Sequence, residues 1–118
     1  MTWYLKPYGL PKPKINRDYT RLIWNGKHYP PGTYNILKGT SITASISIKN
    51  EGDPGKVRVV IWDSYENKAI FSRDMDMSAG QSTDVSHTFT MDRNYAIKII
   101  TYYLDPADNT YKKYDEYG

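Results

Sequence analysis

Hydrophobic and polar residues alternate with a period of two in several short stretches of this chain. From Ile42 to Ile48 every second residue is apolar, and the residues between are Thr or Ser. The same alternation recurs from Val85 to Met91. A period of two places successive side chains on opposite faces of a β-strand, whereas a helix would scatter them around its axis. Both stretches are therefore predicted to be strands with one buried and one solvated face.

Turn-forming residues separate further stretches of the same kind, and no run shows the 3.6-residue period of a helix. Asn25-Gly26 is a strong hairpin signal, because both residues tolerate positive φ. Short strands at regular spacing are typical of an antiparallel sandwich or barrel. We therefore expect an all-β fold, an antiparallel immunoglobulin-like β-sandwich of seven to nine strands with an extended N-terminal arm. The candidate strands are residues 19–24, 27–29, 33–37, 42–49, 56–63, 69–75, 83–91, 95–104 and 111–117.

The stretch 56–63 differs from its neighbours because it is apolar on both faces. Val57, Val59 and Ile61 share one face, and Val60 and Trp62 share the other. This pattern predicts a central strand, or a strand whose outer face is covered by the arm. The residues expected in the core are Ile46, Val59, Ile61, Phe89, Ile97 and Ile99.

Residues 1–18 are predicted to form the arm, and residues 19–118 the sandwich domain. Pro7, Pro11 and Pro13 each remove a backbone donor, which argues against a central strand or a helix. The arm nevertheless carries large side chains that need burial. We expect it to pack on its own sheet or to add to a second copy of the chain. These side chains are Trp3, Tyr4, Leu5, Tyr8 and Leu10.

Size, charge and cysteine content narrow the class of protein. The 118 residues fit one domain, and the absence of cysteine excludes disulfides and thiolate chemistry. Sixteen basic against thirteen acidic residues give too weak a positive charge to favour nucleic acid. No apolar run approaches the roughly 18 residues of a membrane span. The start of the chain lacks the apolar stretch of a signal peptide, so we expect a virion or cytoplasmic protein, or an extracellular one whose leader was removed.

No catalytic or metal-binding motif stands out. His87 lies on an apolar strand face, which is typical of a core histidine, and His28 follows a turn. Asp74 and Asp76 share one strand face, and Asp105 and Asp108 lie in an oxygen-rich loop. That loop lacks the ligand spacing of an EF-hand calcium site. We therefore expect no enzyme activity, no cofactor and no metal.

Twelve tyrosines are the most unusual feature of the composition. Tyrosine offers a large contact area for a small loss of entropy and is enriched at interfaces. We expect a protein partner or self-association, with a glycan as one alternative, bound by exposed rings such as Trp3, Trp24 or Trp62. A small nucleic-acid binder is the other alternative, because basic residues and aromatics interleave at 21–29 and 111–117. The candidate partner-binding residues are Trp3, Tyr4, Tyr8, Trp24, Tyr29, Tyr102, Tyr111 and Tyr114.

Residues of about 37–105 resemble the CARDB domain, a cell-adhesion-related module of bacteria and archaea. The alternating strand KGTSITASISIKNEGD with its Asn50-Glu51-Gly52 turn, the next strand VRVVIWD, and the Ala79-Gly80-Gln81-Ser82 loop carry the likeness. The last core strand, YAIKIITYYLD, fits as well. The resemblance implies an immunoglobulin-like or fibronectin type III-like fold and a binding or scaffolding role without catalytic residues. A self-standing sandwich with an arm would also suit a virus or phage structural protein.

Overall fold

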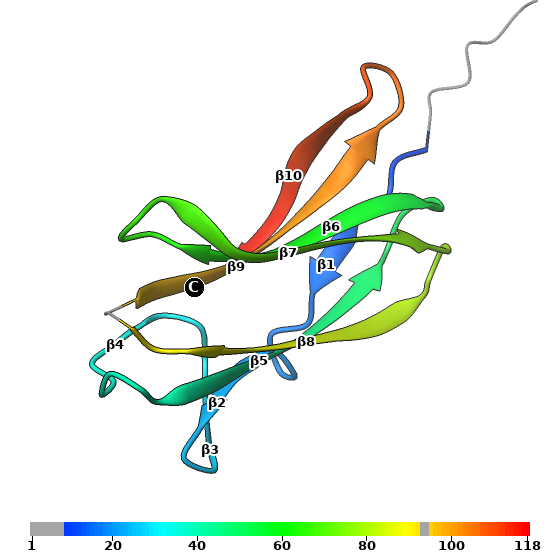
Figure 1. Ribbon diagram of the computed structural model, residues 1–118. Coiled ribbons are helices and arrows are strands. Elements are labelled where there is room, and N and C mark those ends of the chain that lie inside the picture. The colour runs from blue at the N-terminus through cyan, green and yellow to red at the C-terminus, as the bar shows by residue number, and fades with distance from the viewer. Residues whose placement is uncertain (1–8, 93–94) are drawn as a thin grey trace, which may run out of the picture.

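The computed structural model describes residues 9–92 and 95–118 of the chain. These residues form two antiparallel β-sheets packed face to face, and they contain no helix (Figure 1). The alternation of apolar residues explains this arrangement, because each sheet can bury one face only against the other sheet. The predicted all-β sandwich is thus confirmed at the level of its architecture.

The first sheet is built around β5 (Ser41–Asn50), which is paired along its whole length with β8 (Ser82–Thr90). The opposite edge of β5 is shared by two short strands, β1 (Pro13–Ile15) and β2 (Arg21–Trp24). A hairpin connects β2 to β3 (Lys27–Tyr29). Asn25 and Gly26 both have positive φ, 51° and 72°, as the predicted two-residue turn requires.

The second sheet is built around β6 and β9. β6 (Gly55–Asp63) lies between β7 (Lys68–Met77) and β9 (Tyr95–Asp105). β10 (Thr110–Tyr117) and the two-residue β4 (Thr33–Tyr34) share the other edge of β9. The prediction that 56–63 is a central strand is confirmed.

The core lies between the two sheets and is filled by the inward residues of the long strands. Ile46, Val59, Ile61, Ile97 and Ile99 are buried, as predicted. Phe89 is only partly buried, because β8 is a sheet edge and its side chain lies at the open side of the sandwich. The largest fully buried side chains include Ile15, Leu22, Ile42, Ile48, Met77 and Met91.

The described residues form ten strands, more than the seven to nine expected. The strand that the sequence did not predict is β1, within the stretch assigned to the arm. Proline is tolerated at the first residue of an edge strand, because the missing N–H is not needed there. Pro13 occupies that position, and Ile15 is fully buried. The described part of the arm, residues 9–18, therefore packs on its own domain.

A buried asparagine holds this segment in place. Asn50 has no exposed surface, and its Oδ1 accepts hydrogen bonds from the Lys12 amide at 2.9 Å and the Gly52 amide at 3.0 Å. Its Nδ2 donates to the carbonyl oxygens of Asp53 and Ser78 at 2.9 and 3.2 Å. One side chain thus joins the N-terminal segment to the β5–β6 and β7–β8 turns.

A second set of contacts closes one side of the sandwich. The Asp115 carboxylate on β10 accepts a hydrogen bond from the Ile15 amide at 2.9 Å and is paired with Arg17 at 3.0 Å. The Thr101 hydroxyl on β9 donates to the Pro13 carbonyl at 2.6 Å. β1 therefore fastens the first sheet to the second through both the backbone and charged side chains.

Candidate functional site

The outward face of the second sheet carries a layer of aromatic and charged side chains. Alternation along β6 sends Val57, Val59 and Ile61 to the core, so Arg58, Val60 and Trp62 face outward. Residues directly opposite one another in an antiparallel pair share a face. The registers of β6 with β9 and of β9 with β10 therefore add Lys98, Ile100, Tyr102, Leu104, Tyr111, Lys113 and Glu116 to this outward face.

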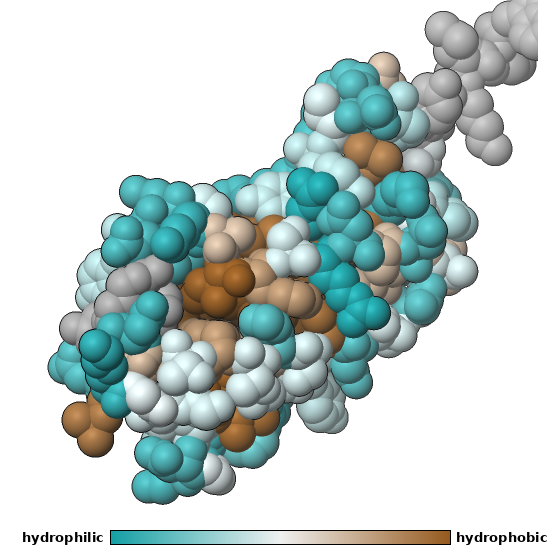
Figure 2. All heavy atoms as spheres, in the orientation of Figure 1, coloured by the Kyte–Doolittle hydropathy of each residue, from teal (hydrophilic) through white to brown (hydrophobic). Residues whose placement is uncertain are grey.

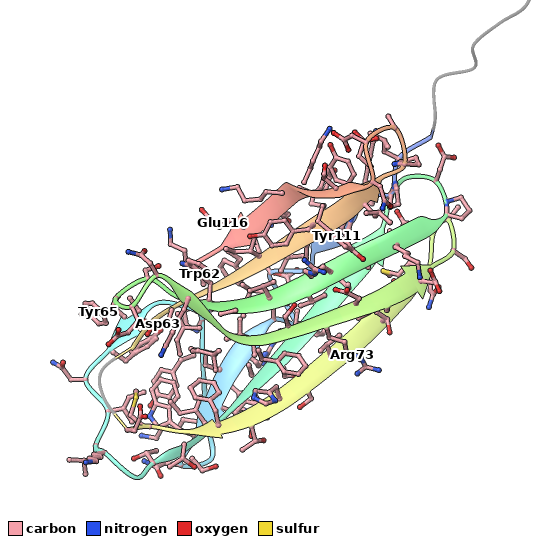
Figure 3. The ribbon with its side chains drawn as sticks, turned by 45° about the horizontal axis from the view of Figure 1, so that its top comes forward. Trp62, Asp63, Tyr65, Arg73, Tyr111 and Glu116 are labelled. Atoms are coloured by element: carbon pink, nitrogen blue, oxygen red, sulfur yellow. The ribbon has the colours of Figure 1, made fainter. Side chains whose placement is uncertain are left out.

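Two aliphatic residues at the centre of this face are almost fully buried. Val60 and Ile100 lie opposite each other in the register, and each is 5% exposed. Figure 3 is turned toward this face of the sheet and labels Trp62 and Tyr111, whose side chains project from it. The larger side chains around Val60 and Ile100 therefore cover them. The result is an apolar centre beneath a shell of aromatic and charged groups.

The shell is held by an ordered set of contacts around Arg58. Its guanidinium donates two hydrogen bonds to Asp74, from Nε at 2.6 Å and from Nη2 at 3.0 Å. The same group lies 3.9 Å from the centre of the Tyr111 ring, in cation–π geometry. The hydrogen bond from Arg58 lowers the pKa of Asp74 below its usual value and outweighs the opposing effect of burial. Arg58 thus links β6, β7 and β10 across the face.

Charge is nearly balanced over this part of the surface. Lys56 pairs with Asp76 at 3.3 Å, and Arg58 pairs with Asp74. Lys98 and Lys113 share one carboxylate, that of Glu116, at 3.8 and 3.5 Å. These four cations and three carboxylates leave only a small positive excess, which gives little attraction to phosphate backbones.

Two of the predicted partner-binding residues, Tyr102 and Tyr111, lie on this face. Tyr114, the residue at the bulge of β10, is 39% exposed. Trp3, Tyr4 and Tyr8 fall outside the described residues.

Trp24 and Tyr29 lie elsewhere, and the expectation that Trp24 is exposed is wrong. Trp24 is 9% exposed, because β2 turns it inward together with Leu22. Its ring stacks on Tyr29 at a centroid distance of 3.9 Å and meets Tyr34 edge-on at 5.1 Å. These three rings cover the core at the end of the first sheet. Trp24 is therefore a packing residue.

Arg58, Asp74, Val60 and Ile100 were not predicted from the sequence as members of a site. One signal pointed to them, since Val60 and Trp62 make 56–63 apolar on both faces. The same pattern also suggested that the arm covers the outer face of 56–63. Residues 9–18, the described part of the arm, do not cover it, because they lie against β5 and the inner side of β9 and β10.

The remaining candidate groups have structural partners. His87 stacks on Phe71 at 4.2 Å, and His28 Nδ1 lies 3.3 Å from Arg21. Lys112 occupies the oxygen-rich loop, with its Nζ 2.6 Å from Asp105 and 3.1 Å from Asp108. The hydrogen bond from Lys112 lowers the pKa of Asp105, and hydrogen bonds from the Thr110 hydroxyl and then from Lys112 lower the pKa of Asp108. No group of three or more metal-ligating side chains occurs within residues 9–92 and 95–118.

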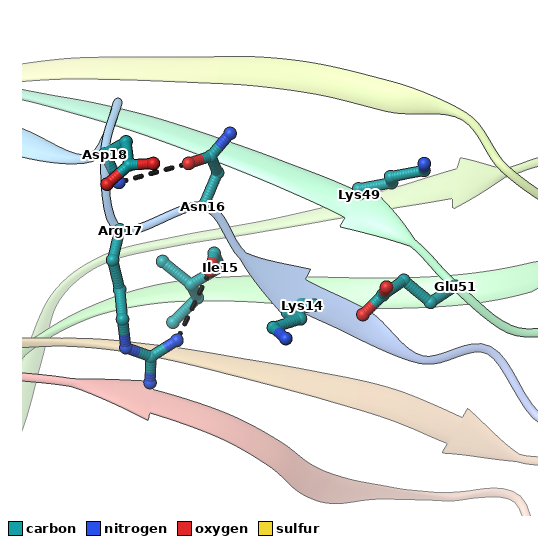
Figure 4. Close-up of a pocket in the computed structure, with 7 residues that line it drawn as sticks. All are labelled: Lys14, Ile15, Asn16, Arg17, Asp18, Lys49 and Glu51. Atoms are coloured by element: carbon teal, nitrogen blue, oxygen red, sulfur yellow. Dashed lines mark hydrogen bonds between the residues drawn. The ribbon is translucent and has the colours of Figure 1, made fainter.

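Figure 4 shows a shallow pocket of about 330 Å³ beside β1 on the first sheet. Lys14 and Lys49 lie directly opposite each other in the β1–β5 register, with Glu51 nearby. Arg17, at the far side, donates to the Ile15 carbonyl at 3.3 Å. The pocket therefore combines charged side chains of both signs with no paired nucleophile and base among its lining residues.

The described part of the chain contains no helix long and apolar enough to cross a membrane. Comparison with protein-family models, curated proteins and solved structures finds no match for this chain.

Proposed function

We propose that this protein is a non-enzymatic binding module whose partner is another protein, bound on the outward face of the β10-β9-β6-β7 sheet. The observation that carries the proposal is the apolar centre at Val60 and Ile100 beneath an ordered shell of Trp62, Tyr111 and Arg58. Trp, Tyr and Arg are the residues enriched at the energetic centres of protein interfaces. Because Arg58 is already fixed by Asp74, little side-chain entropy remains to be lost on binding.

The topology supports an immunoglobulin-like classification. The first sheet contains the long strands β5 and β8 with the short strands β1, β2 and β3, and the second has the order β10-β9-β6-β7 with the short β4 paired to β9. The chain crosses between the sheets after β3, β4, β5, β7 and β8, and crossings of this kind occur in Greek-key sandwiches. The CARDB resemblance points to the same class and to a binding or scaffolding role. A structural role in a larger assembly, such as a virus or phage particle, is one form of this proposal.

A glycan is a second candidate ligand, favoured by one observation on the first sheet. A groove of about 610 Å³ is lined by Tyr19, Arg21, His28, Asp84 and the hydroxyls of Ser45 and Ser47. Tyr19 is 66% exposed, and an exposed ring beside many polar groups suits a sugar. A glycan array would show binding that is lost in Tyr19→Ala and retained in Tyr111→Ala.

The protein-binding proposal is tested by comparing two tyrosine variants in pull-downs from the source cell. Tyr111→Ala removes the ring beneath the Arg58 guanidinium. Tyr65→Ala is the matched control, because Tyr65 is an exposed tyrosine in the β6–β7 turn. We expect one specific protein retained by the unmodified chain and by Tyr65→Ala, and lost with Tyr111→Ala. Equal retention by both variants would place the binding surface elsewhere.

A further inference from the structure

The edges of the two sheets differ in how they are protected against pairing with another chain. An exposed edge strand offers free N–H and C=O groups, and proteins protect such edges with charges, bulges or short strands. β7 carries Lys68, Arg73, Asp74 and Asp76, and Arg73 lies in register with the inward-facing Val59. β10 has a bulge and four charged residues. The other edge of the first sheet consists of short strands such as β3.

β8 has little of this protection. It forms nine consecutive pairs with β5, with no bulge. Only one of its nine residues, Asp84, is charged. Within the described part of the chain, β5 is the only strand to which β8 is paired. β8 is therefore a long and regular edge whose second row of backbone groups faces outward.

An apolar patch lies beside this edge. Figure 2 shows hydrophobic side chains exposed between the two sheets, on the side where β7 and β8 run in Figure 1. The registers put Phe71 and Met75 of β7 and Phe89 of β8 on the inward faces of their sheets, where they are only partly buried. His87 stacks between the rings of Phe71 and Phe89, at 4.2 and 6.3 Å. A strand added to β8 would cover part of this patch as well as the free backbone.

We propose that β8 is a self-association edge, at which β8 of a second copy pairs antiparallel about a two-fold axis at Ser86. This register places Val85 opposite His87 and Thr83 opposite Phe89 of the other copy. Each large inward ring thus faces a smaller residue, and no two like charges face each other. The two first sheets become one continuous sheet across the dimer. This inference is independent of the proposed protein-binding face, which lies on the other sheet.

The position of the single charge is compatible with this pairing. Asp84 lies opposite Thr88 of the other copy, so the two Asp84 carboxylates are four residues apart along the strands. That offset is about 13 Å at 3.3–3.4 Å per residue, beyond the screening length of about 8 Å at physiological ionic strength. Their repulsion is therefore weak.

Cysteine cross-linking tests the register directly, because the chain has no cysteine of its own. In Ser86→Cys, the two new thiols face each other across the axis. Opposed Cα atoms in an antiparallel pair are about 4.5–5.5 Å apart, within the span of a disulfide. We expect a covalent dimer under mild oxidation. Ser72→Cys is the control, since Ser72 is also an exposed serine on an edge strand, β7.

A charge variant tests the association without oxidation. Ser86→Lys places two lysines directly opposite each other, while its side chain stays outside the core. Analytical ultracentrifugation at about 0.1 mM, a concentration that detects micromolar association, should show a dimer for the unmodified chain and a monomer for Ser86→Lys. Ser72→Lys should remain dimeric, and circular dichroism should be the same for all three.

Three results would overturn the proposal. The unmodified chain could be monomeric at that concentration, or the dimer could persist in Ser86→Lys. Alternatively, Ser72→Cys could cross-link as readily as Ser86→Cys, which would indicate random collision. Loss of the dimer on removal of residues 1–8, with Ser86→Lys having no effect, would instead identify the N-terminal segment as the pairing strand.

Discussion

Asp115 is the residue at which acid is expected to weaken this fold. Burial alone would raise its pKa, but hydrogen bonds from Arg17 and from the Ile15 and Glu116 amides lower the pKa below its usual value. A carboxyl group with a lowered pKa in the folded state contributes stability that is present above about pH 4, the pKa in the unfolded chain. That contribution is lost as the pH falls through the folded-state pKa.

We therefore expect Asp115→Asn to reduce the free energy of unfolding by about 1.5 kcal/mol at pH 7, the lower end of the range for hydrogen bonds to charged groups. The difference from the unmodified chain should shrink below pH 4. Urea titrations at several pH values measure it. Asp76→Asn is the control, because Asp76 and Lys56 form an exposed pair, worth at most about 1 kcal/mol. A pH-independent difference would contradict the assignment.

The sequence pattern predicted which residues are buried better than it predicted which side chains contact one another. The inward position of Ile46 follows from alternation alone, since its neighbours Ser45 and Ser47 are polar. The pairing of Arg17 with Asp115 joins positions 98 residues apart, and no local pattern contains it. The Arg58–Tyr111 contact depends in the same way on the registers of β6, β9 and β10. Trp24 was misplaced because 21–24 has large apolar residues on both faces, Leu22 and Trp24 on one and Ile23 on the other.

At the scale of the element, one substitution on each face of β5 tests which face is buried. Ile46→Ala should cost about 2–5 kcal/mol, through lost burial and the cavity left behind. Thr43→Ala should cost about 1 kcal/mol or less, since Thr43 faces outward and its hydroxyl meets that of Thr88 at 2.8 Å. Chemical denaturation followed by fluorescence measures both. Equal costs would mean that the faces of β5 are reversed.

The long strands, their turns and the short strands β2, β3 and β4 follow from the sequence, whereas β1 does not. β5, β6, β8 and β9 carry enough alternating or continuous apolar residues to be recognised. β1 has three residues and begins with Pro13, so its pairing is decided by the free edge of β5 and by the burial of Ile15. Tertiary context of this kind leaves no periodic trace in three residues.

At the scale of the whole molecule, the two sheets should unfold together. They share one core, and β1 connects them through Asp115 and Thr101, so neither sheet can keep its buried face covered alone. Trp24 reports on the first sheet and Trp62 on the second. We expect fluorescence of Trp62→Phe and of Trp24→Phe, together with circular dichroism, to give coincident denaturation curves for each variant. Two separated transitions would show that the sheets are independent units.

The Asn50 side chain has a consequence for hydrogen exchange. The Lys12 amide donates a hydrogen bond to Asn50 Oδ1, and the Lys12 carbonyl accepts a hydrogen bond from the Glu51 amide at 2.9 Å. Both protons become free when the segment around Lys12 separates from the end of β5, where Asn50 is the last residue and is held by the β5–β6 and β7–β8 turns. A short, proline-flanked segment near the start of the chain would then exchange on the timescale of global opening rather than of local fraying.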